Sequence, residues 1–165
     1  MGHAAKISTS VALVVSFSVR GFWKYWLPAI VWIVFIFIGS TDLLSAAHTS
    51  RFIGPFLRWF APEVSDATIA SVQLIVRKCG HLTEYAVLAA LIFRALRQQL
   101  VNRPGLIAFI LAAVLAALDE FHQSFVASRT GTPWDVAIDC LGALAGLTIF
   151  AMFRRNRNST TGKRE

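Results

Sequence analysis

Histidine, carboxylate and cationic residues gather at the ends of the apolar stretches of this chain, and their types suit acid–base chemistry or recognition of a polar headgroup. The set consists of Lys78, His81, Glu84, Tyr85, Asp119, Glu120, His122, Gln123, Arg129, Asp135 and Asp139. Imidazole and crowded carboxyl groups can exchange protons near neutral pH, whereas cations bind phosphate. Ionisable groups at membrane depth are costly and usually face the interior of a helix bundle. We therefore take this set as the candidate functional residues.

The composition is that of an integral membrane protein with one domain. Hydrophobic residues form 56% of the 165 residues before the ten glycines are counted, and only 15% of residues are charged. Soluble domains contain about 45–50% apolar residues with glycine included. The two cysteines, Cys79 and Cys140, lack metal-binding or disulfide spacing, so we expect both to be packing residues. We predict no metal or other cofactor.

The net charge of +7 reflects membrane topology rather than nucleic-acid binding. The basic residues flank apolar stretches and do not form a stripe interleaved with exposed aromatic residues. Eleven of the sixteen fall with the N-terminus, the 97–105 loop and the C-terminus, so the positive-inside rule predicts that this side is cytoplasmic. The other five are Arg51, Arg58, Arg77, Lys78 and Arg129.

Four apolar stretches are predicted to be membrane spans, and the first has the roughly 20 residues that a hydrocarbon core about 30 Å thick requires. They cover residues 22–44, 79–96, 106–118 and 134–153. Between the first two lies a mixed loop that contains Gly54-Pro55, and a helix start is expected with Ser65 as its N-cap. The apolar spacing that follows the cap, at Ile69, Val72 and Val76, predicts an amphipathic surface segment before the second span.

The expected fold is an all-α membrane protein, with a four-helix bundle and an amphipathic surface helix before the second span. Residues 1–21 form an N-terminal segment, 22–153 the four-span domain and 154–165 a basic polar cytoplasmic tail. Arg20 interrupts the apolar stretch of 11–19, so we expect this segment to be retained rather than cleaved as a signal peptide. Both termini are predicted to be cytoplasmic.

Helical spacing predicts that the candidate residues share faces of three spans. Residues three or four apart lie on one helix face, which groups Lys78, His81 and Glu84 or Tyr85 on the second span. The same spacing relates Asp119 to Gln123 on the third span and Asp135 to Asp139 on the fourth. Singly, such residues are often packing contacts, helix caps or loop cations. Their joint position at one membrane side favours an outward-facing pocket.

Three segments of the sequence together resemble the motifs of a known protein family. They read Arg77-Lys78-x-Gly80-His81-x-x-Glu84-Tyr85, then Leu118-Asp119-Glu120-Phe121-His122-Gln123, then Arg129-x-Gly131-x-x-x-Asp135-x-x-x-Asp139-x-x-Gly142. In order and spacing they resemble the VanZ-like family of small bacterial membrane proteins, over residues 25–153. The resemblance implies a location in the bacterial plasma membrane and, for the namesake of the family, reduced sensitivity to glycopeptide antibiotics such as teicoplanin. It implies no settled reaction.

Two main functions are compatible with these residues. In the first, the cations Lys78 and Arg129 and the neighbouring carboxylates bind or modulate a cell-envelope component. The expected partners are membrane lipids, a lipid-linked cell-wall intermediate or a glycopeptide, and not nucleic acid. In the second, the protein hydrolyses or transfers a group of such a lipid. The candidate catalytic residues are His81, Asp119, Glu120 and His122, with His81 or Glu120 as general base.

Two other hypotheses receive less support from the sequence. A metal centre would use His81, Glu120, His122 and Asp139, but no HExxH or His/Cys pattern accompanies them. A transporter or proton relay would need titratable residues along the whole path. The inner halves of the four spans contain none, so a one-sided pocket fits better than a channel.

Overall fold

The structure is a computed structural model that describes residues 19–41, 46–99, 101–127, 129 and 131–161. Helices form nearly all of this part of the chain: α2 (Val19–Gly39), α3 (Ala46–Phe60), α4 (Asp66–Arg97), α5 (Pro104–Gln123) and α6 (Pro133–Thr161). Most of the predicted N-terminal segment, residues 1–18, and the last four residues of the predicted tail lie outside the described residues. α6 continues as a helix beyond Phe153, so the first part of that tail is helical.

Four of these helices are long and apolar enough to cross a membrane. The candidate spans are Gly21–Gly39, Asp66–Arg97, Pro104–Gln123 and Pro133–Arg154. Large apolar side chains such as Val31, Leu118 and Leu141 are exposed on the outside of the bundle, as a lipid environment requires. The predicted all-α, multi-pass membrane fold is confirmed.

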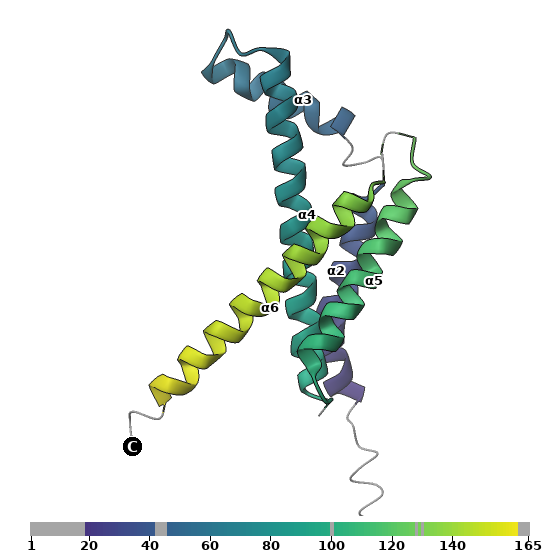
Figure 1. Cartoon of the computed structure of the whole chain (residues 1–165), viewed down its shortest axis with the longest axis vertical. Helices are drawn as coiled ribbons and strands as arrows, with labels where there is room; N and C mark the ends of the chain where they lie inside the picture. Colours follow the sequence, from purple (N-terminus) through teal and green to yellow (C-terminus); the bar gives the residue numbers. More distant parts are fainter. Residues whose placement is uncertain (1–18, 42–45, 100, 128, 130, 162–165) are drawn as a thin grey trace, which may run out of the picture.

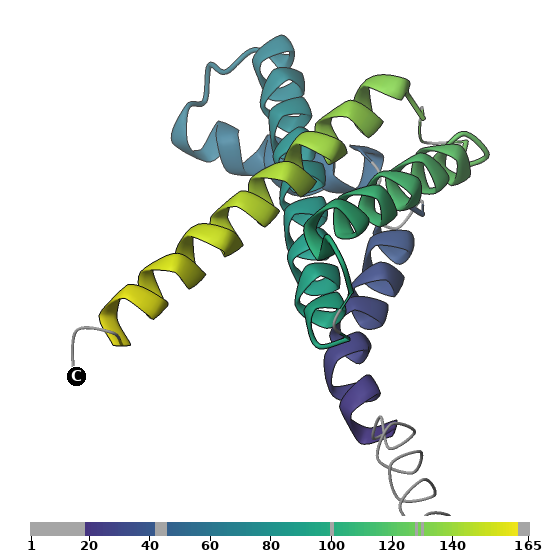
Figure 2. The ribbon, with the colours of Figure 1, turned by 60° about the horizontal axis from the view of Figure 1, so that its bottom comes forward.

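α4 is the central helix of the bundle. It packs against α2, α3, α5 and α6, and α5 also packs against α6. Figure 1 shows α2 and α5 beside the lower part of α4, while α6 crosses α4 obliquely. The turned view in Figure 2 shows that the C-terminal half of α6 diverges from the other helices. Contact between α4 and α6 is therefore concentrated near their crossing point.

Two glycines let α6 approach the backbone of α4 at this crossing. A Cβ atom on Gly142 would lie 2.2 Å from the carbonyl oxygen of Leu82, and one on Gly146 would lie 2.1 Å from that of Ala86. Neither position has room for a side chain. Small residues four apart are a common means of close helix association in membranes, where lipid removes the hydrophobic drive between helices.

The second span and the surface helix differ in position from the sequence expectation. α4 is continuous for 32 residues from its N-cap Ser65, whose Oγ accepts a hydrogen bond from the Thr68 N–H at 3.2 Å. The stretch with Ile69 and Val76 is thus the first part of the second span. The surface helix that precedes this span is α3, in the segment predicted as a loop, and it continues through Pro55.

α3 exposes an aromatic face, which explains why it is a helix despite Gly54-Pro55. Phe52, Phe56 and Phe60 recur at four-residue spacing, and all three are exposed together with Trp59. This pattern is typical of a helix that lies in a membrane interface. In Figure 1, α3 crosses the end of α4 that projects beyond the other spans.

Candidate functional site

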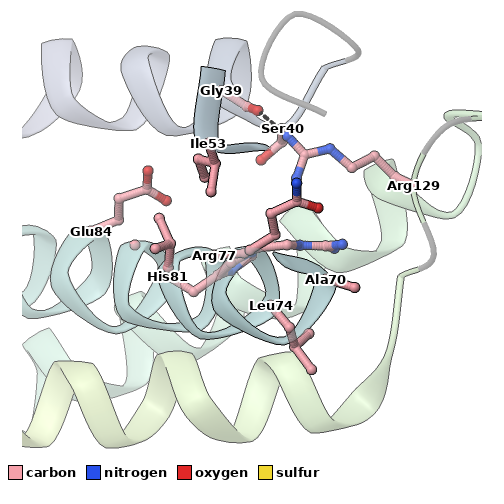
Figure 3. A pocket seen from close by; sticks show the side chains of 12 residues that line it. Gly39, Ser40, Ile53, Ala70, Leu74, Arg77, His81, Glu84 and Arg129 are labelled. Carbon is pink, nitrogen blue, oxygen red and sulfur yellow. Dashed lines mark hydrogen bonds between the residues drawn. The ribbon is translucent and has the colours of Figure 1, made fainter. Parts of the chain in front are cut away.

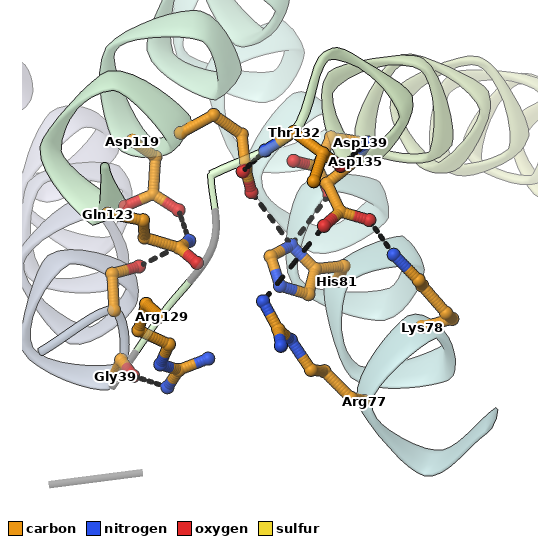
Figure 4. Close-up of polar contacts among 12 residues, drawn as sticks. Gly39, Arg77, Lys78, His81, Asp119, Gln123, Arg129, Thr132, Asp135 and Asp139 are labelled. Atoms are coloured by element: carbon orange, nitrogen blue, oxygen red, sulfur yellow. Dashed lines mark hydrogen bonds and ion pairs between the residues drawn. The ribbon is translucent and has the colours of Figure 1, made fainter. Parts of the chain in front are cut away.

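Polar residues are buried together at one end of the bundle, which we call the polar end. Here the C-terminal ends of α2 and α5 and the N-terminal end of α6 surround the middle of α4 (Figure 4). The buried polar residues are Ser40, His81, Asp119, Glu120, Gln123, Arg129, Asp135 and Asp139. Tyr85 is also buried, whereas Lys78 and Glu84 are half-buried. The structure thus brings most of the candidate residues to one region.

Three helices contribute one residue each to a group that we call the His81 triad: His81, Glu120 and Asp139. The Nδ1 atom of His81 lies 3.2 Å from Oδ1 of Asp139 and 3.9 Å from Oε1 of Glu120. The other carboxylate oxygen of Glu120 accepts a hydrogen bond from the Thr132 N–H at 2.9 Å. These three side chains could hold a metal ion, because each offers a ligand atom within 4.8 Å of the others.

Asp135 pairs with the cations of α4. The Nζ atom of Lys78 donates a hydrogen bond to Oδ1 of Asp135, and Nη2 of Arg77 lies 4.0 Å from Oδ2. Thr132 is at the N-cap position of α6, where its Oγ1 accepts a hydrogen bond from the Asp135 N–H at 3.2 Å. Asp135 therefore forms an ion pair between helices, while Thr132 caps the helix.

Asp119 and Gln123 connect α5 to α2. Gln123 Nε2 donates hydrogen bonds to Oδ2 of Asp119 at 2.9 Å and to Oγ of Ser40 at 3.4 Å. Oδ1 of Asp119, Oε1 of Gln123 and the hydroxyl of Tyr85 are buried with no hydrogen-bond partner among the described residues. Because most buried polar atoms in proteins are hydrogen-bonded, these atoms leave capacity for water or a ligand.

Arg129 joins the loop between α5 and α6 to the end of α2. Its Nη2 atom donates hydrogen bonds to the carbonyl oxygens of Gly39 at 2.7 Å and Thr41 at 3.4 Å. Cations are favourable at the C-terminal end of a helix, where carbonyl groups lack helical partners. Burial lowers the pKa of the Arg129 guanidinium, and the positive charge of Arg77 acts in the same direction.

Gly131 allows this loop to lie against α5. A Cβ atom at this position would lie 2.3 Å from the carbonyl oxygen of Glu120, so only glycine permits the contact. The close approach places the Thr132 N–H at the Glu120 side chain. Sequence reasoning gave Thr132 no role, although Gly131 belongs to the segment that carries the family resemblance.

A cavity of about 290 Å³ opens beside the triad, between α2, α3 and α4. Its polar wall includes Arg77, His81, Glu84 and Arg129, and Ile53 of α3 contributes to its apolar wall. Figure 3 shows these side chains around the cavity. Arg77 was not among the candidate site residues, although it lies four residues before His81 and so shares its helix face.

His122 lies apart from the His81 triad. Its ring packs against Phe37 of α2, with the ring centroids 6.0 Å apart, and it lines a separate surface pocket. Of the four residues considered as metal ligands from the sequence, the structure gathers only three. Glu84 contributes to the α2–α4 contact through its backbone, because its carbonyl oxygen accepts a hydrogen bond from Trp32 Nε1 at 2.9 Å.

Comparison with known proteins gives one match. Neither a curated protein nor a solved structure matches the chain. The family model described as VanZ/LLP1 matches residues 25–154, which include the four candidate spans apart from the first turn of the first one, and every residue of the polar end. On this match, the chain belongs to the VanZ/LLP1 family of membrane proteins, as its sequence motifs indicate.

Proposed function

We propose that this protein binds the anionic headgroup of an envelope lipid, or of a lipid-linked cell-wall intermediate, in the cavity at the polar end. The observation that carries the proposal is a pair of incompletely bonded arginines in the cavity wall. Buried Nε and Nη2 atoms of Arg77, and Nε of Arg129, have no hydrogen-bond partner among the described residues. Guanidinium groups form strong charge-assisted hydrogen bonds with phosphate.

An anion would also reduce repulsion between the two guanidinium groups. Burial and, after it, the positive charge of Arg77 lower the pKa of Arg129, while neighbouring carboxylates, Asp119 first, act in the opposite direction. Lys78 does not reduce the repulsion between the two guanidinium groups, because it adds a third positive charge and pairs with Asp135. A phosphate between Arg77 and Arg129 would accept the unused hydrogen bonds and neutralise charge.

The other walls of the cavity suit the first part of a lipid tail. Ile53, Ala70 and Leu74 are apolar lining residues. The volume of about 290 Å³ is at the lower limit of small-molecule sites, which span about 300–1,000 Å³. A headgroup fits such a space, whereas a glycopeptide antibiotic is too large to be enclosed. We propose that any link to teicoplanin tolerance acts through the bound lipid.

We place the polar end on the extracytoplasmic side of the bacterial plasma membrane, with both termini in the cytoplasm. Eleven of the sixteen basic residues support this orientation through the positive-inside rule. A cysteine-free variant with Phe125→Cys, in the loop after α5, should react with a membrane-impermeant maleimide in intact cells. A second cysteine-free variant that carries Asn102→Cys in place of Phe125→Cys should react only after cell lysis. The reverse pattern would contradict the orientation.

Lipid binding is tested by native mass spectrometry of the purified full chain with undecaprenyl phosphate and phosphatidylglycerol, against a neutral glucosyl diacylglycerol. We expect preference for the phosphate lipids. Arg77→Gln should weaken this binding about tenfold or more, since a hydrogen bond to a charged group contributes about 1.5–3 kcal/mol. Arg58→Gln on α3 is the matched control and should bind as the unmodified chain does. Equal binding of neutral and phosphate lipids would overturn the proposal.

A second candidate function is acid–base hydrolysis or group transfer on the same lipid. The contact between His81 and Asp139, beside the cavity, favours it, because a carboxylate that orients an imidazole is a common arrangement in general-base catalysis. Purified protein would then convert a phosphate lipid, and His81→Gln would abolish conversion while retaining binding. Full conversion by that variant would exclude His81 as the base.

A further inference from the structure

The His81 triad has an excess of negative charge and is buried. His81, Glu120 and Asp139 are 6%, 5% and 0% exposed. Even with a positively charged imidazole, two carboxylates leave a net charge of −1 within the triad. The amine of Lys78, three residues before His81, pairs with Asp135. An unpaired charge in a low-dielectric interior is strongly destabilising, and either a proton on a carboxylate or a further cation would remove this cost.

Unused ligand atoms point to the position of that cation. Oε1 of Glu120 and Oδ2 of Asp139 are buried and have no hydrogen-bond partner among the described residues. Oε2 of Glu120 is held by the Thr132 N–H, which orients Oε1 toward Nδ1 of His81. Hydrogen bonds that fix a ligand in this way are typical of the surroundings of metal sites.

We propose that His81, Glu120 and Asp139 bind a divalent transition-metal ion such as Zn²⁺ or Mn²⁺. One imidazole nitrogen with two carboxylates is a ligand set that these ions accept, and Ca²⁺ or Mg²⁺ would favour oxygen ligands alone. Nδ1 is the expected ligand atom of His81, because it is the ring nitrogen that faces both carboxylates.

The distances within the triad are close to those that a metal site requires. Bonds of about 2.0–2.1 Å in tetrahedral geometry place two ligand atoms about 3.3 Å apart. Nδ1 of His81 lies 3.2 Å from Asp139 and 3.9 Å from Glu120, and the three residues offer ligand atoms within 4.8 Å of one another, so side-chain rotation toward a shared ion would complete the set. His122 packs against Phe37 and is not a ligand in this arrangement.

Three protein ligands leave at least one coordination position open, as in catalytic zinc sites. His81 also lines the cavity, so the metal would lie next to the space assigned above to a headgroup. The metal proposal does not depend on the lipid proposal, because it rests on the triad alone. Arg77→Gln should therefore keep the metal while it loses the phosphate lipid.

The test uses the purified, untagged full chain, stripped with a chelator and reloaded with Zn²⁺ or Mn²⁺. We expect one bound metal ion for each chain, measured by inductively coupled plasma mass spectrometry. Glu120→Gln and Asp139→Asn should each weaken binding by at least about tenfold, the lower limit known for residues that only support a ligand. The matched controls His122→Ala and Glu63→Gln should retain full binding.

X-ray absorption on the reloaded, unmodified chain provides a measurement that does not depend on the folding of variants. The proposal expects one imidazole nitrogen and oxygen ligands, with no sulfur. Failure of the folded, unmodified chain to take up either ion would overturn it, as would a spectrum with sulfur ligands. The proposal would also be overturned if His122→Ala lost the metal while Asp139→Asn bound it fully.

Discussion

The contact between α4, α5 and α6 has two halves, and each half is stabilised by different forces. Toward one end, the helices pack through Ala89, Ala112 and Ala143, all fully buried, with Gly146 against the α4 backbone. At the polar end, the same helices are joined by charged and amide side chains. Close backbone packing supplies dispersion contacts that lipid cannot replace, whereas the polar end depends on pairing charges that lipid cannot solvate.

This difference shows which half is built for packing alone. The alanine contact leaves no polar group to satisfy. The polar end buries several oxygen and nitrogen atoms that have no partner among the described residues. If its side chains served only to join helices, a fully satisfied network or apolar residues would be more stable. The unmet hydrogen-bonding capacity is therefore the physical basis for placing function at the polar end.

The largest expected effect comes from the apolar contact. Gly146→Leu should separate α4 from α6 and lower the free energy of unfolding by more than about 3 kcal/mol, beyond the usual range for overpacking, because the obstacle is backbone. Unfolding by sodium dodecyl sulfate in mixed micelles measures this change. Leu144→Val, at an exposed position two residues away, is the control and should unfold at the wild-type midpoint. An unchanged midpoint for Gly146→Leu would refute the tight crossing.

An intermediate effect is expected at the polar end. Asp135→Asn removes the partner of Lys78 and should destabilise the fold by about 2 kcal/mol, less than the 3–5 kcal/mol of a fully buried pair because Lys78 is partly exposed. Adding Lys78→Gln should recover part of this loss, since only the more distant Arg77 then lacks this carboxylate. The same micelle titration measures both variants. Strictly additive destabilisation would show that the two side chains do not interact.

The smallest effect is expected for an ion pair outside the bundle. Arg58 Nη2 and Asp66 Oδ1 lie 2.6 Å apart, but their side chains are 55% and 90% exposed. Water screens such pairs, so Arg58→Gln should change the free energy of unfolding by less than about 1 kcal/mol. A change as large as that for Asp135→Asn would mean that burial does not set the strength of ion pairs in this protein.

Local sequence rules predicted the four spans and the polar faces well. The apolar lengths identified the spans, and the four-residue spacing of Asp135 and Asp139 placed them on one face. The same rule indicates that His122, two residues after Glu120, points about 200° around the helix from it. Its place on another face of α5 was therefore available from spacing, although its residue type and its position at the end of the third span grouped it with the site.

Other features depend on tertiary contacts that spacing does not encode. The Gly54-Pro55 pair is typical of a loop, yet α3 is helical there. Its exposed aromatic face is suited to the apolar side of a membrane interface. Gly142 and Gly146 could be recognised as a small-residue pair, but the partner backbone could not. The link from Thr132 to Glu120 depends on how tightly a loop folds against α5, which no periodicity reports.

The length of α4 fixes how deep its cations lie. From Arg77 to Arg97 the helix rises about 30 Å, which equals the thickness of the hydrocarbon core. If Arg97 lies at one boundary of the core, Arg77 lies at the opposite one, and the first eleven residues of α4 extend beyond it to the interfacial helix α3. A bound lipid could thus present its phosphate to Arg77 while its tail stays within the leaflet. Recognition would then require sideways diffusion only, without extraction of the lipid from the bilayer.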